Sequence, residues 1–285
     1  MTAMPNTRTP TNDDADAGGF ASDPVFEALL ALADPDADGT LYDGDGAAIY
    51  DALVAQDSGE RTEVLRAVQQ TSGPILELAC GSGRLALALL SLGRPVTALD
   101  LSADMLALLR ERYAALPARA RAATAAPLST VHGDMAAVAL PDRFGAIILA
   151  TTSLTLLPAA QRPELYRRIR AHLAPGARFF VSVHAVRPHE ASATVAVPGL
   201  HTGQMLLISD VVRAGAESRD VQVMSLTRTD DGIRLGGIYR SRPLLLGVDD
   251  ISAELRAAGF RTVQPATTIA ATDGDRATIL LEAAP

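Results

Sequence analysis

The stretch Glu77-Leu-Ala-Cys-Gly-Ser-Gly83 joins a short apolar run to the helical pattern of residues 84–92. Two glycines at such a strand-to-helix turn let the backbone bend tightly and let a ligand approach without interference from Cβ atoms. The spacing Gly81-x-Gly83-x-x-Ala86 also fits the turn of dinucleotide-binding domains. The turn therefore predicts a ligand-binding strand–turn–helix unit and leaves the ligand open.

Short apolar runs alternate with amphipathic helical patterns on both sides of this turn. Such alternation is typical of a parallel sheet wound on both faces. The expected strands are 75–79, 96–99, 128–132, 146–150, 178–184, 261–265 and 277–282, and the expected helices are 84–92, 103–113, 161–173 and 251–258. We therefore predict an α/β fold with a doubly wound, mostly parallel sheet of seven strands.

The segments before this core have other patterns. Residues 1–23 are polar and acidic, which is typical of a disordered tail. Residues 24–72 contain three runs with helical periodicity and are expected to form an N-terminal helical lid. The ligand-binding core is then expected to span residues 73–185.

The pattern changes again after the fifth expected strand. Apolar runs at 204–212, 221–229 and 233–239, with turn residues such as Asp230-Asp-Gly232 between them, predict antiparallel strands. We therefore expect an antiparallel β insertion over residues 186–247. Residues 248–285 would then complete the core sheet.

Composition excludes several classes of protein. The 285 residues carry a formal net charge of −8 without a basic run, which disfavours nucleic acid as a partner. All 25 basic residues are arginines, which excludes a phosphate-binding Walker lysine, a Schiff-base lysine and the Tyr-x-x-x-Lys pair of many dehydrogenases. The single cysteine, Cys80, excludes a multi-cysteine metal site. Without a membrane-spanning run or signal-peptide pattern, we expect a cytoplasmic protein with no membrane partner.

Acidic residues follow three neighbouring strands of the expected sheet. Asp100 ends the second strand, where a carboxylate can accept both ribose hydroxyls of a nucleoside. Asp134 follows the third strand, at a position that a turn residue also explains. Glu77 ends the first strand, and a buried carboxylate is costly unless it is paired. Glu77 therefore favours a ligand with a cationic group over a nicotinamide dinucleotide.

The glycine turn, the run Leu99-Asp-Leu-Ser-Ala-Asp-Met-Leu106 and the segment His132-Gly-Asp-Met135 resemble motifs of class I S-adenosylmethionine-dependent methyltransferases. The resemblance spans roughly residues 72–185 and implies a Rossmann-like fold. It also implies S-adenosyl-L-methionine as cofactor and S-adenosyl-L-homocysteine as product. The cofactor-binding residues expected from it are Glu77, Ala79, Gly81, Gly83, Arg84, Asp100, Leu101, Met105, Asp134, Met135 and Ala150.

Three of these roles have alternatives. In the family, a side chain such as Leu101 or Met105 packs on the adenine, although helical spacing also makes Met105 a core residue. Asp134 would accept a hydrogen bond from the adenine amino group, and the alternative for it is a turn residue. Arg84 either meets the cofactor carboxylate or faces solvent.

Methyl transfer from a sulfonium is a direct displacement that depends on alignment and desolvation. The segment Leu149–Thr155 holds no carboxylate and no Asp/Asn-Pro-Pro-aromatic motif, which disfavours magnesium-dependent O-methylation and methylation of DNA amino groups. We therefore expect a metal-free transfer to an amine, with no metal ligands. The candidate catalytic residues are Tyr42, Tyr50 and His184, and each of the three also fits a packing role.

Tyr42 and Tyr50 lie in Leu41-Tyr-Asp-Gly-Asp-Gly-Ala-Ala-Ile-Tyr-Asp51, which resembles the lid of small-amine N-methyltransferases such as those acting on amino sugars. With the glycine turn and the run 97–102, this segment is also similar to methyltransferases of daptide-type ribosomal peptide biosynthesis. Those enzymes are thought to dimethylate an amine at the modified C-terminus of a peptide. The resemblance implies a small-molecule or peptide amine as acceptor, with the insertion as acceptor wall or homodimer contact.

Three alternatives stay open at this point. The chain fits an amino-sugar or other small-molecule N- or O-methyltransferase equally in fold and cofactor. A nicotinamide-dependent oxidoreductase would need a proton donor other than lysine and would leave Glu77 without a purpose. The third alternative is a cofactor-binding module without activity.

Overall fold

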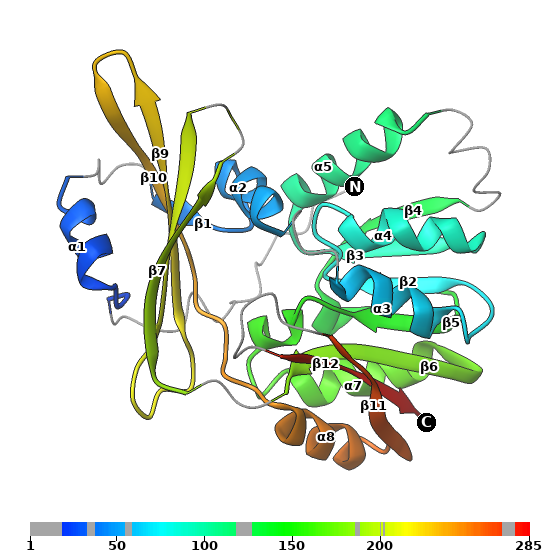
Figure 1. Cartoon of the computed structure of the whole chain (residues 1–285). Helices are drawn as coiled ribbons and strands as arrows, with labels where there is room; N and C mark the ends of the chain where they lie inside the picture. The colour runs from blue at the N-terminus through cyan, green and yellow to red at the C-terminus, as the bar shows by residue number, and fades with distance from the viewer. Residues whose placement is uncertain are drawn as a thin grey trace, which may run out of the picture.

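The computed structural model describes residues 19–32, 38–54, 59–117, 127–185, 189–199, 201, 203–269 and 277–285. A seven-stranded sheet in the spatial order β11-β12-β6-β5-β2-β3-β4 forms the core (Figure 1). Its strands are β2 (Ile75–Leu78), β3 (Val96–Asp100), β4 (Leu128–His132), β5 (Phe144–Leu149), β6 (Leu173–His184), β11 (Thr262–Ile269) and β12 (Thr278–Ala284). β12 is antiparallel to both of its neighbours, and the other pairs are parallel. The predicted doubly wound α/β fold is confirmed.

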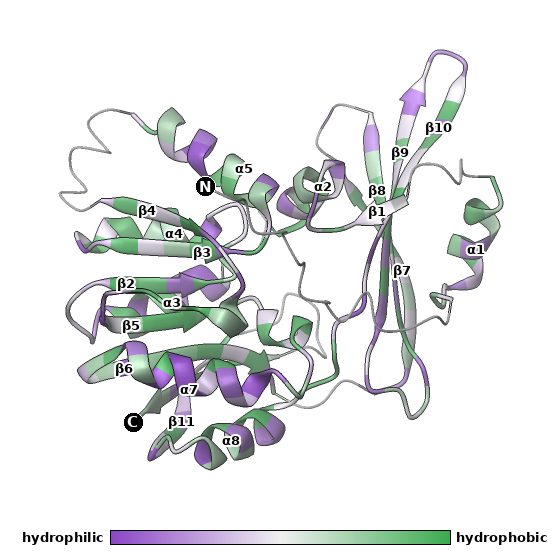
Figure 2. Cartoon of the chain, turned by 180° about the vertical axis from the view of Figure 1, so that it is seen from behind, coloured by the Kyte–Doolittle hydropathy of each residue, from purple (hydrophilic) through white to green (hydrophobic). Residues whose placement is uncertain are grey.

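Helices cover both faces of this sheet. One face carries α3 (Gly59–Val68), α4 (Arg84–Leu89) and α5 (Ala103–Ala115), and the other carries α7 (Arg162–His172) and α8 (Val248–Ala257). Strands β2 and β5 are buried along their whole length, as expected for parallel strands covered on both sides. Figure 2 shows the corresponding hydrophobic colour along the central strands and hydrophilic patches on α7 and α8.

The described residues include three short 3-10 helices beside this sheet: η2 (Leu90–Leu92), η3 (Met135–Ala137) and η4 (Ser153–Leu156). The η3 and η4 turns follow β4 and β5, at the carboxyl edge of the sheet. None of the helices in the described ranges is long and apolar enough to cross a membrane.

A second sheet of five strands stands beside the core (Figure 1). Its order is β1-β10-β9-β8-β7, with β1 (Asp38–Thr40), β7 (Ala191–Pro198), β8 (Gln204–Val212), β9 (Asp220–Thr229) and β10 (Gly232–Ser241). Strands β8, β9 and β10 match the predicted antiparallel runs, whereas β1 and β7 are strands that the pattern did not predict. β1 pairs in parallel with β10, so a piece of the N-terminal segment belongs to this sheet.

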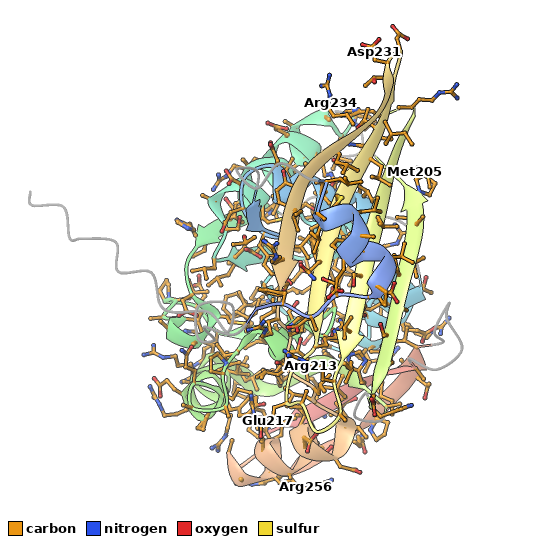
Figure 3. All side chains as sticks on the ribbon, turned by 90° about the vertical axis from the view of Figure 1, so that its left-hand side faces the viewer. Met205, Arg213, Glu217, Asp231, Arg234 and Arg256 are labelled. Carbon is orange, nitrogen blue, oxygen red and sulfur yellow. The ribbon has the colours of Figure 1, made fainter. Side chains whose placement is uncertain are left out.

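The N-terminal helices take up different positions around the second sheet. Helix α1 (Pro24–Leu30) packs Phe26 on the outer face against Leu207 and Met224, and Figure 3 shows α1 crossing that face. Helix α2 (Asp45–Val54) lies between the two sheets, and α3 packs on the core (Figure 1). The segment expected to be one helical lid is therefore divided, and only the part around α2 faces the core and the second sheet together.

The expected tail of residues 1–23 lies outside the described residues up to position 18. The residues from Phe20 to Asp23, which belong to the expected tail, contact the second sheet. The Ala21 N–H donates to Asp220 Oδ2 at 2.8 Å, and the Arg242 guanidinium lies 4.2 Å from the centre of the Phe20 ring. This cation–π contact and the hydrogen bond hold the chain just before α1.

A charged contact joins the two helices on one face of the core. The Arg162 side chain is buried, and its Nε and Nη2 donate to Glu254 of α8 at 2.9 and 2.7 Å. The buried Tyr166 hydroxyl donates to the same carboxylate at 2.8 Å. Glu254 therefore satisfies two polar groups that α7 places inside the protein, where an unpaired group would be costly.

Replacing Glu254 by Gln should lower the free energy of unfolding by about 1–3 kcal/mol, because it leaves the buried Arg162 guanidinium without a counter-ion. Urea unfolding followed by circular dichroism measures the effect. Glu164→Gln is the matched control, since Glu164 makes its ion pairs on the exposed side of α7 and such pairs contribute little. Equal losses in the two variants would contradict the role assigned to Glu254.

Candidate active site

The glycine turn that follows β2 has an unusual backbone. Ala79, Gly81 and Gly83 have φ values of 50°, 54° and 85°. A Cβ atom at Gly83 would lie 2.0 Å from Leu109 Cδ1, so this glycine permits the close packing of α4 on α5. A Cβ atom at Gly81 would meet no atom within 4 Å. The space beside Gly81 is therefore open to a ligand.

Asp100 is bound to the turn from the next strand. Its Oδ2 accepts the Gly81 N–H at 2.7 Å, and its Oδ1 accepts the Ser102 N–H at 2.8 Å. A carboxylate has about four lone-pair sites, so Asp100 can accept further hydrogen bonds. Burial raises the pKa of Asp100 from its usual value, and the two backbone hydrogen bonds act in the opposite direction. The predicted nucleoside acceptor therefore stands directly beside the glycine turn.

Glu77 is buried at the carboxyl end of β2, with 3% of its surface exposed. Its Oε2 atom has no hydrogen-bond partner. Burial raises the pKa of Glu77 to about 8; the Arg84 guanidinium lowers it, and the carboxylates of Glu60 and Asp100 raise it further. The site thus contains a buried acidic group whose Oε2 has no polar partner among the described residues and whose pKa is raised further by two other acids.

Glu60, from α3, is a site residue that the sequence did not indicate. Its Oε2 pairs with Arg84 Nη2 at 2.5 Å, and its Oε1 accepts the Thr151 N–H at 2.6 Å and the Ser182 hydroxyl at 2.7 Å. Arg84 also donates to Thr151 Oγ1 at 3.0 Å. Arg84 therefore faces the interior beside the turn, and its partner is an acid from another helix; it does not face solvent.

The same contacts hold a strained turn after β5. Thr151 and Thr152 have φ values of 55° and 52°, in the left-handed region that costs about 1–3 kcal/mol for such residues. The Glu60 carboxylate binds the Thr151 N–H, and the Thr152 N–H donates to Ser182 Oγ at 3.2 Å. Such strain is often found at functional sites, and here it fixes the loop that faces the second sheet.

The other predicted cofactor residues lie along the same edge. Asp134 begins η3, where its Oδ1 accepts the Ala136 N–H at 2.8 Å. Leu101 is 42% exposed, whereas Met105 is 2% exposed and packs inside the protein. Of these two candidates for an apolar wall, only Leu101 presents an accessible surface. Two further residues occupy the strand ends: Met135 is partly buried against the core, and Ala150 is buried.

The segment 41–54 around α2, which is the part of the expected lid that faces the core and is called the lid below, is bound directly to the glycine turn. Asp51 of α2 is buried and pairs with Ser82 Oγ and with Arg112 of α5. The Ser102 hydroxyl donates to the Tyr42 carbonyl oxygen at 2.6 Å, and the Gly44 N–H donates to Asp104 at 2.7 Å. These contacts hold the lid on the edge of the core where Asp100 and the turn lie.

The two lid tyrosines lie against each other. Their ring centres are 5.2 Å apart in an edge-to-face arrangement. The Tyr42 hydroxyl and Ser241 Oγ share a hydrogen bond of 2.9 Å, whereas the Tyr50 hydroxyl has no hydrogen-bond partner in the described part of the chain. Burial raises the pKa of Tyr50 to about 12, so the group is a neutral phenol.

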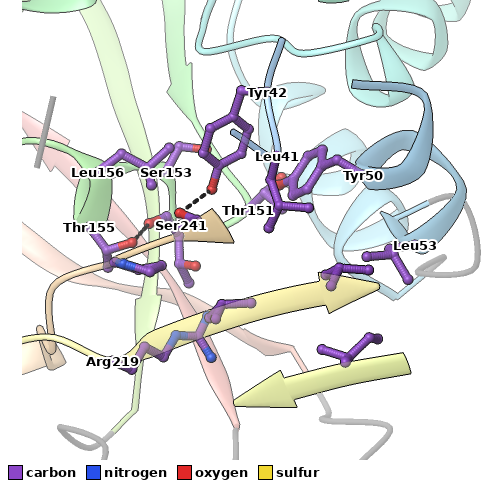
Figure 4. Close-up of a pocket in the computed structure, with 15 residues that line it drawn as sticks. Leu41, Tyr42, Tyr50, Leu53, Thr151, Ser153, Thr155, Leu156, Arg219 and Ser241 are labelled. Atoms are coloured by element: carbon purple, nitrogen blue, oxygen red, sulfur yellow. Dashed lines mark hydrogen bonds between the residues drawn. The ribbon is translucent and has the colours of Figure 1, made fainter. Parts of the chain in front are cut away.

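A cavity of about 120 Å³ lies between the lid, the strained turn after β5 and the second sheet (Figure 4). It is lined by Leu41, Tyr42, Tyr50, Leu53, Thr151, Thr152, Ser153, Thr155, Leu156, Ile208, Arg219, Val221, Val223, Ser241 and Pro243. The structure thus brings the two predicted tyrosines together. His184 is buried at the end of β6 but is not among the lining residues, so the structure does not place it with them.

Among the described residues, no group of three or more His, Cys, Asp or Glu side chains is arranged to hold a metal ion. The polar groups of the turn and the cavity include carboxylates, hydroxyls and the guanidinium groups of Arg84 and Arg219.

Known proteins are similar to this chain in sequence and in fold. The profile of the family described as "Methyltransferase domain" matches residues 75–176. The curated protein "Putative methyltransferase YqeM" from Bacillus subtilis (strain 168) is 27% identical over 148 residues, which are 51% of this chain and 56% of that protein. The chain thus spans just over half the length of this curated relative.

Solved structures cover more of the chain. The glycopeptide N-methyltransferase MtfA in complex with S-adenosyl-L-homocysteine has a TM-score of 0.60 and 29% identity, over 93% of this chain and 99% of that chain. MtfA in complex with sinefungin is 30% identical over 80% of this chain and 94% of its own, with a TM-score of 0.53. The CcbJ methyltransferase from Streptomyces caelestis shares the fold, with a TM-score of 0.64 and 22% identity over 84% of this chain and 98% of that chain.

The family match and the solved structures agree with one another on a methyltransferase. The chain belongs to the class I S-adenosylmethionine-dependent methyltransferases.

Proposed function

We propose that this chain transfers a methyl group from S-adenosyl-L-methionine to the amine of a small molecule or of a modified peptide C-terminus. The observation that carries the cofactor end of the proposal is the buried Glu77 Oε2, which has no partner and lies near Glu60 and Asp100. A sulfonium and an α-amino group are cations and would supply the missing partner. The pyrophosphate of a nicotinamide dinucleotide would instead add negative charge.

The predicted cofactor roles fit the same edge of the sheet. Glu77 would face the cationic methionine half, beside the open space at Gly81. Asp100 would accept hydrogen bonds from the ribose hydroxyls, and Asp134 would accept one from the adenine amino group. Leu101 would form the apolar wall at the adenine, a role for which its exposed surface is suited.

The acceptor end of the site supports an amine. The residues that line the cavity include no carboxylate and no imidazole, so no strong base stands ready to remove a proton from an alcohol. A neutral amine needs no such base, because it presents a lone pair directly. That lone pair forms the new N–C bond while the electrons of the S–C bond stay on sulfur, and the resulting ammonium releases a proton to water. MtfA, which is 29% identical, is a glycopeptide N-methyltransferase.

The peptide acceptor rests on the resemblance of the Tyr42–Asp51 lid to daptide-type methyltransferases. In this structure Tyr50 is the lid residue best suited to act on the reacting groups, since its hydroxyl lines the cavity without a partner. Its position between the cavity and the charged turn residues would let it accept a hydrogen bond from the amine and help to exclude water. Such alignment lowers the barrier of a direct displacement.

Binding of S-adenosyl-L-methionine at pH 7 should release close to one proton, of which Glu77 is the source. With a pKa of about 8, the Glu77 carboxyl is mostly protonated at pH 7, and a bound cation would favour the charged form. Calorimetric titration in buffers of different ionisation enthalpy measures the protons released.

The same carboxyl should make stability depend on pH. Because folding raises the pKa of Glu77 above the ordinary carboxyl value, the free energy of unfolding of the ligand-free protein should fall as pH rises from about 4.5 to 8.

Glu77→Gln should abolish that proton release and weaken binding, while Glu164→Gln on the exposed face of α7 should change neither. An unaltered proton release in Glu77→Gln would remove Glu77 from the cofactor site.

Tyr50→Phe should lower the single-turnover methylation rate roughly tenfold, or about 1.4 kcal/mol in the barrier, because the change keeps the ring and removes only the hydroxyl. The affinity for S-adenosyl-L-homocysteine, measured by calorimetry, should change by less. Tyr42→Phe is the matched control: its hydroxyl bonds to Ser241, so we expect a smaller effect on the rate. Wild-type rates in both variants would assign the two tyrosines to packing.

A further inference from the structure

Arg219 is the one charged side chain among the residues that line the cavity. It immediately precedes β9 and therefore belongs to the second sheet. Figure 4 shows it on that side of the cavity, facing the space that Tyr42 and Tyr50 close from the lid. The sequence pattern did not single it out, because it is one of 25 arginines in the chain.

Both ends of Arg219 are held in place. Its backbone N–H donates to the Pro243 carbonyl oxygen at 2.9 Å, and its Nη1 donates to Asp210 Oδ2 at 2.9 Å. A guanidinium has five N–H donors, and the others make no hydrogen bond to the described part of the chain. The side chain is 19% exposed, so these donors face the cavity from a fixed position.

Arg219 also acts on the residue nearest to the expected reaction. The pKa of Tyr50 is raised by burial, and it responds to Arg84, Glu60 and Asp100 as well as to Arg219. Tyr50 therefore lies within electrostatic reach of the cofactor end on one side and of Arg219 on the other. Arg219 and Tyr50 line the same cavity, so a group bound to Arg219 would lie in the space that Tyr50 also faces.

The lining also determines which charge an acceptor can carry there. It contains no carboxylate that could hold an ammonium group, and the fixed cation disfavours a second positive charge. An oxygen of a carbonyl or carboxylate group is the natural partner of guanidinium N–H donors. The aliphatic side chains of Leu53, Ile208 and Val223 complete a wall suited to a branched hydrocarbon group.

We propose that Arg219 is the specificity-determining residue for the acceptor and binds the oxygen of a carbonyl or carboxylate group attached to the carbon that bears the methylated amine. The inference rests on the proposed amine transfer and names the acceptor class within its small-molecule alternative: an α-amino amide or an α-amino acid with a free amine. Amines that lack this oxygen bind less well.

Three probes with one hydrocarbon skeleton test the proposal: leucinamide, leucine and 3-methylbutylamine, which is leucine without its carboxyl group. Calorimetry measures the affinity of each for the protein saturated with S-adenosyl-L-homocysteine. Leucinamide or leucine should bind at least tenfold more tightly than 3-methylbutylamine, and Arg219→Met should reduce this preference to about one. Tighter binding of leucinamide than of leucine identifies the bound oxygen as that of an amide, and the reverse order identifies it as that of a carboxylate.

The ratio of the affinities for two probes is compared between the wild type and the Arg219 variant. The different basicity of the three amines contributes equally to both ratios and therefore cancels. Arg213→Met is the matched control, since Arg213 pairs with Asp220 but does not line the cavity, and it should keep the full preference. The double variant Arg219→Met/Asp210→Asn avoids leaving the partner carboxylate unpaired if the single variant is unstable. Equal affinities in the wild type, or a preference that survives the loss of Arg219, would overturn the assignment.

Methyl transfer to the same three amines, followed by mass spectrometry, separates this inference from the proposed function. A protein with an Arg219-dependent preference that methylates none of them would contradict amine transfer and leave the binding role of Arg219 standing. Methylation of all three with equal efficiency would support amine transfer and contradict the role of Arg219.

Discussion

The gathering of three carboxylates at one edge of a parallel sheet, two of them buried and one partly buried, is the constraint on which the rest of the structure depends. Like charges inside a protein repel and lose hydration, so each needs donors close by. Glu60 receives them from Arg84, Thr151 and Ser182, and Asp100 from two backbone N–H groups. The positions of α3, the glycine turn and the strained turn after β5 follow from these bonds. The Oε2 atom of Glu77, by contrast, has no partner among the described residues.

The core was predictable because its signals are local. Apolar runs with the strand period, helical periodicity and the glycine turn each lie within a few residues, and together they predict the seven-stranded sheet and the place of Asp100. Glu60 was not predictable, because an acid in the first turn of a helix is ordinarily solvated. The strand β1 has no apolar pattern and exists through its pairing with β10, far along the chain. The choice between Leu101 and Met105 likewise depends on burial, which only the folded chain determines.

The two ends of the site have opposite chemistry. The end near the glycine turn gathers acids around one guanidinium, which suits a cationic cofactor. The end near the second sheet offers hydroxyls, aliphatic side chains and Arg219, which suits a neutral amine beside an oxygen. Tyr50 stands between them. This separation of charge would keep each reactant in its own half before the two meet.

The pairing of β1 with β10 has a consequence for how such enzymes diversify. The tyrosine-bearing segment and the sheet that carries Arg219 share one hydrogen-bonded ladder, although nearly 200 residues separate β1 from β10 in sequence. Recombination that exchanged the insertion alone would break this ladder and leave Tyr42 without Ser241. We therefore expect the acceptor specificity to change most readily in two ways. Either the tyrosine-bearing segment and the insertion are inherited together, or single side chains that line the cavity are substituted while the pairing of β1 with β10 is kept.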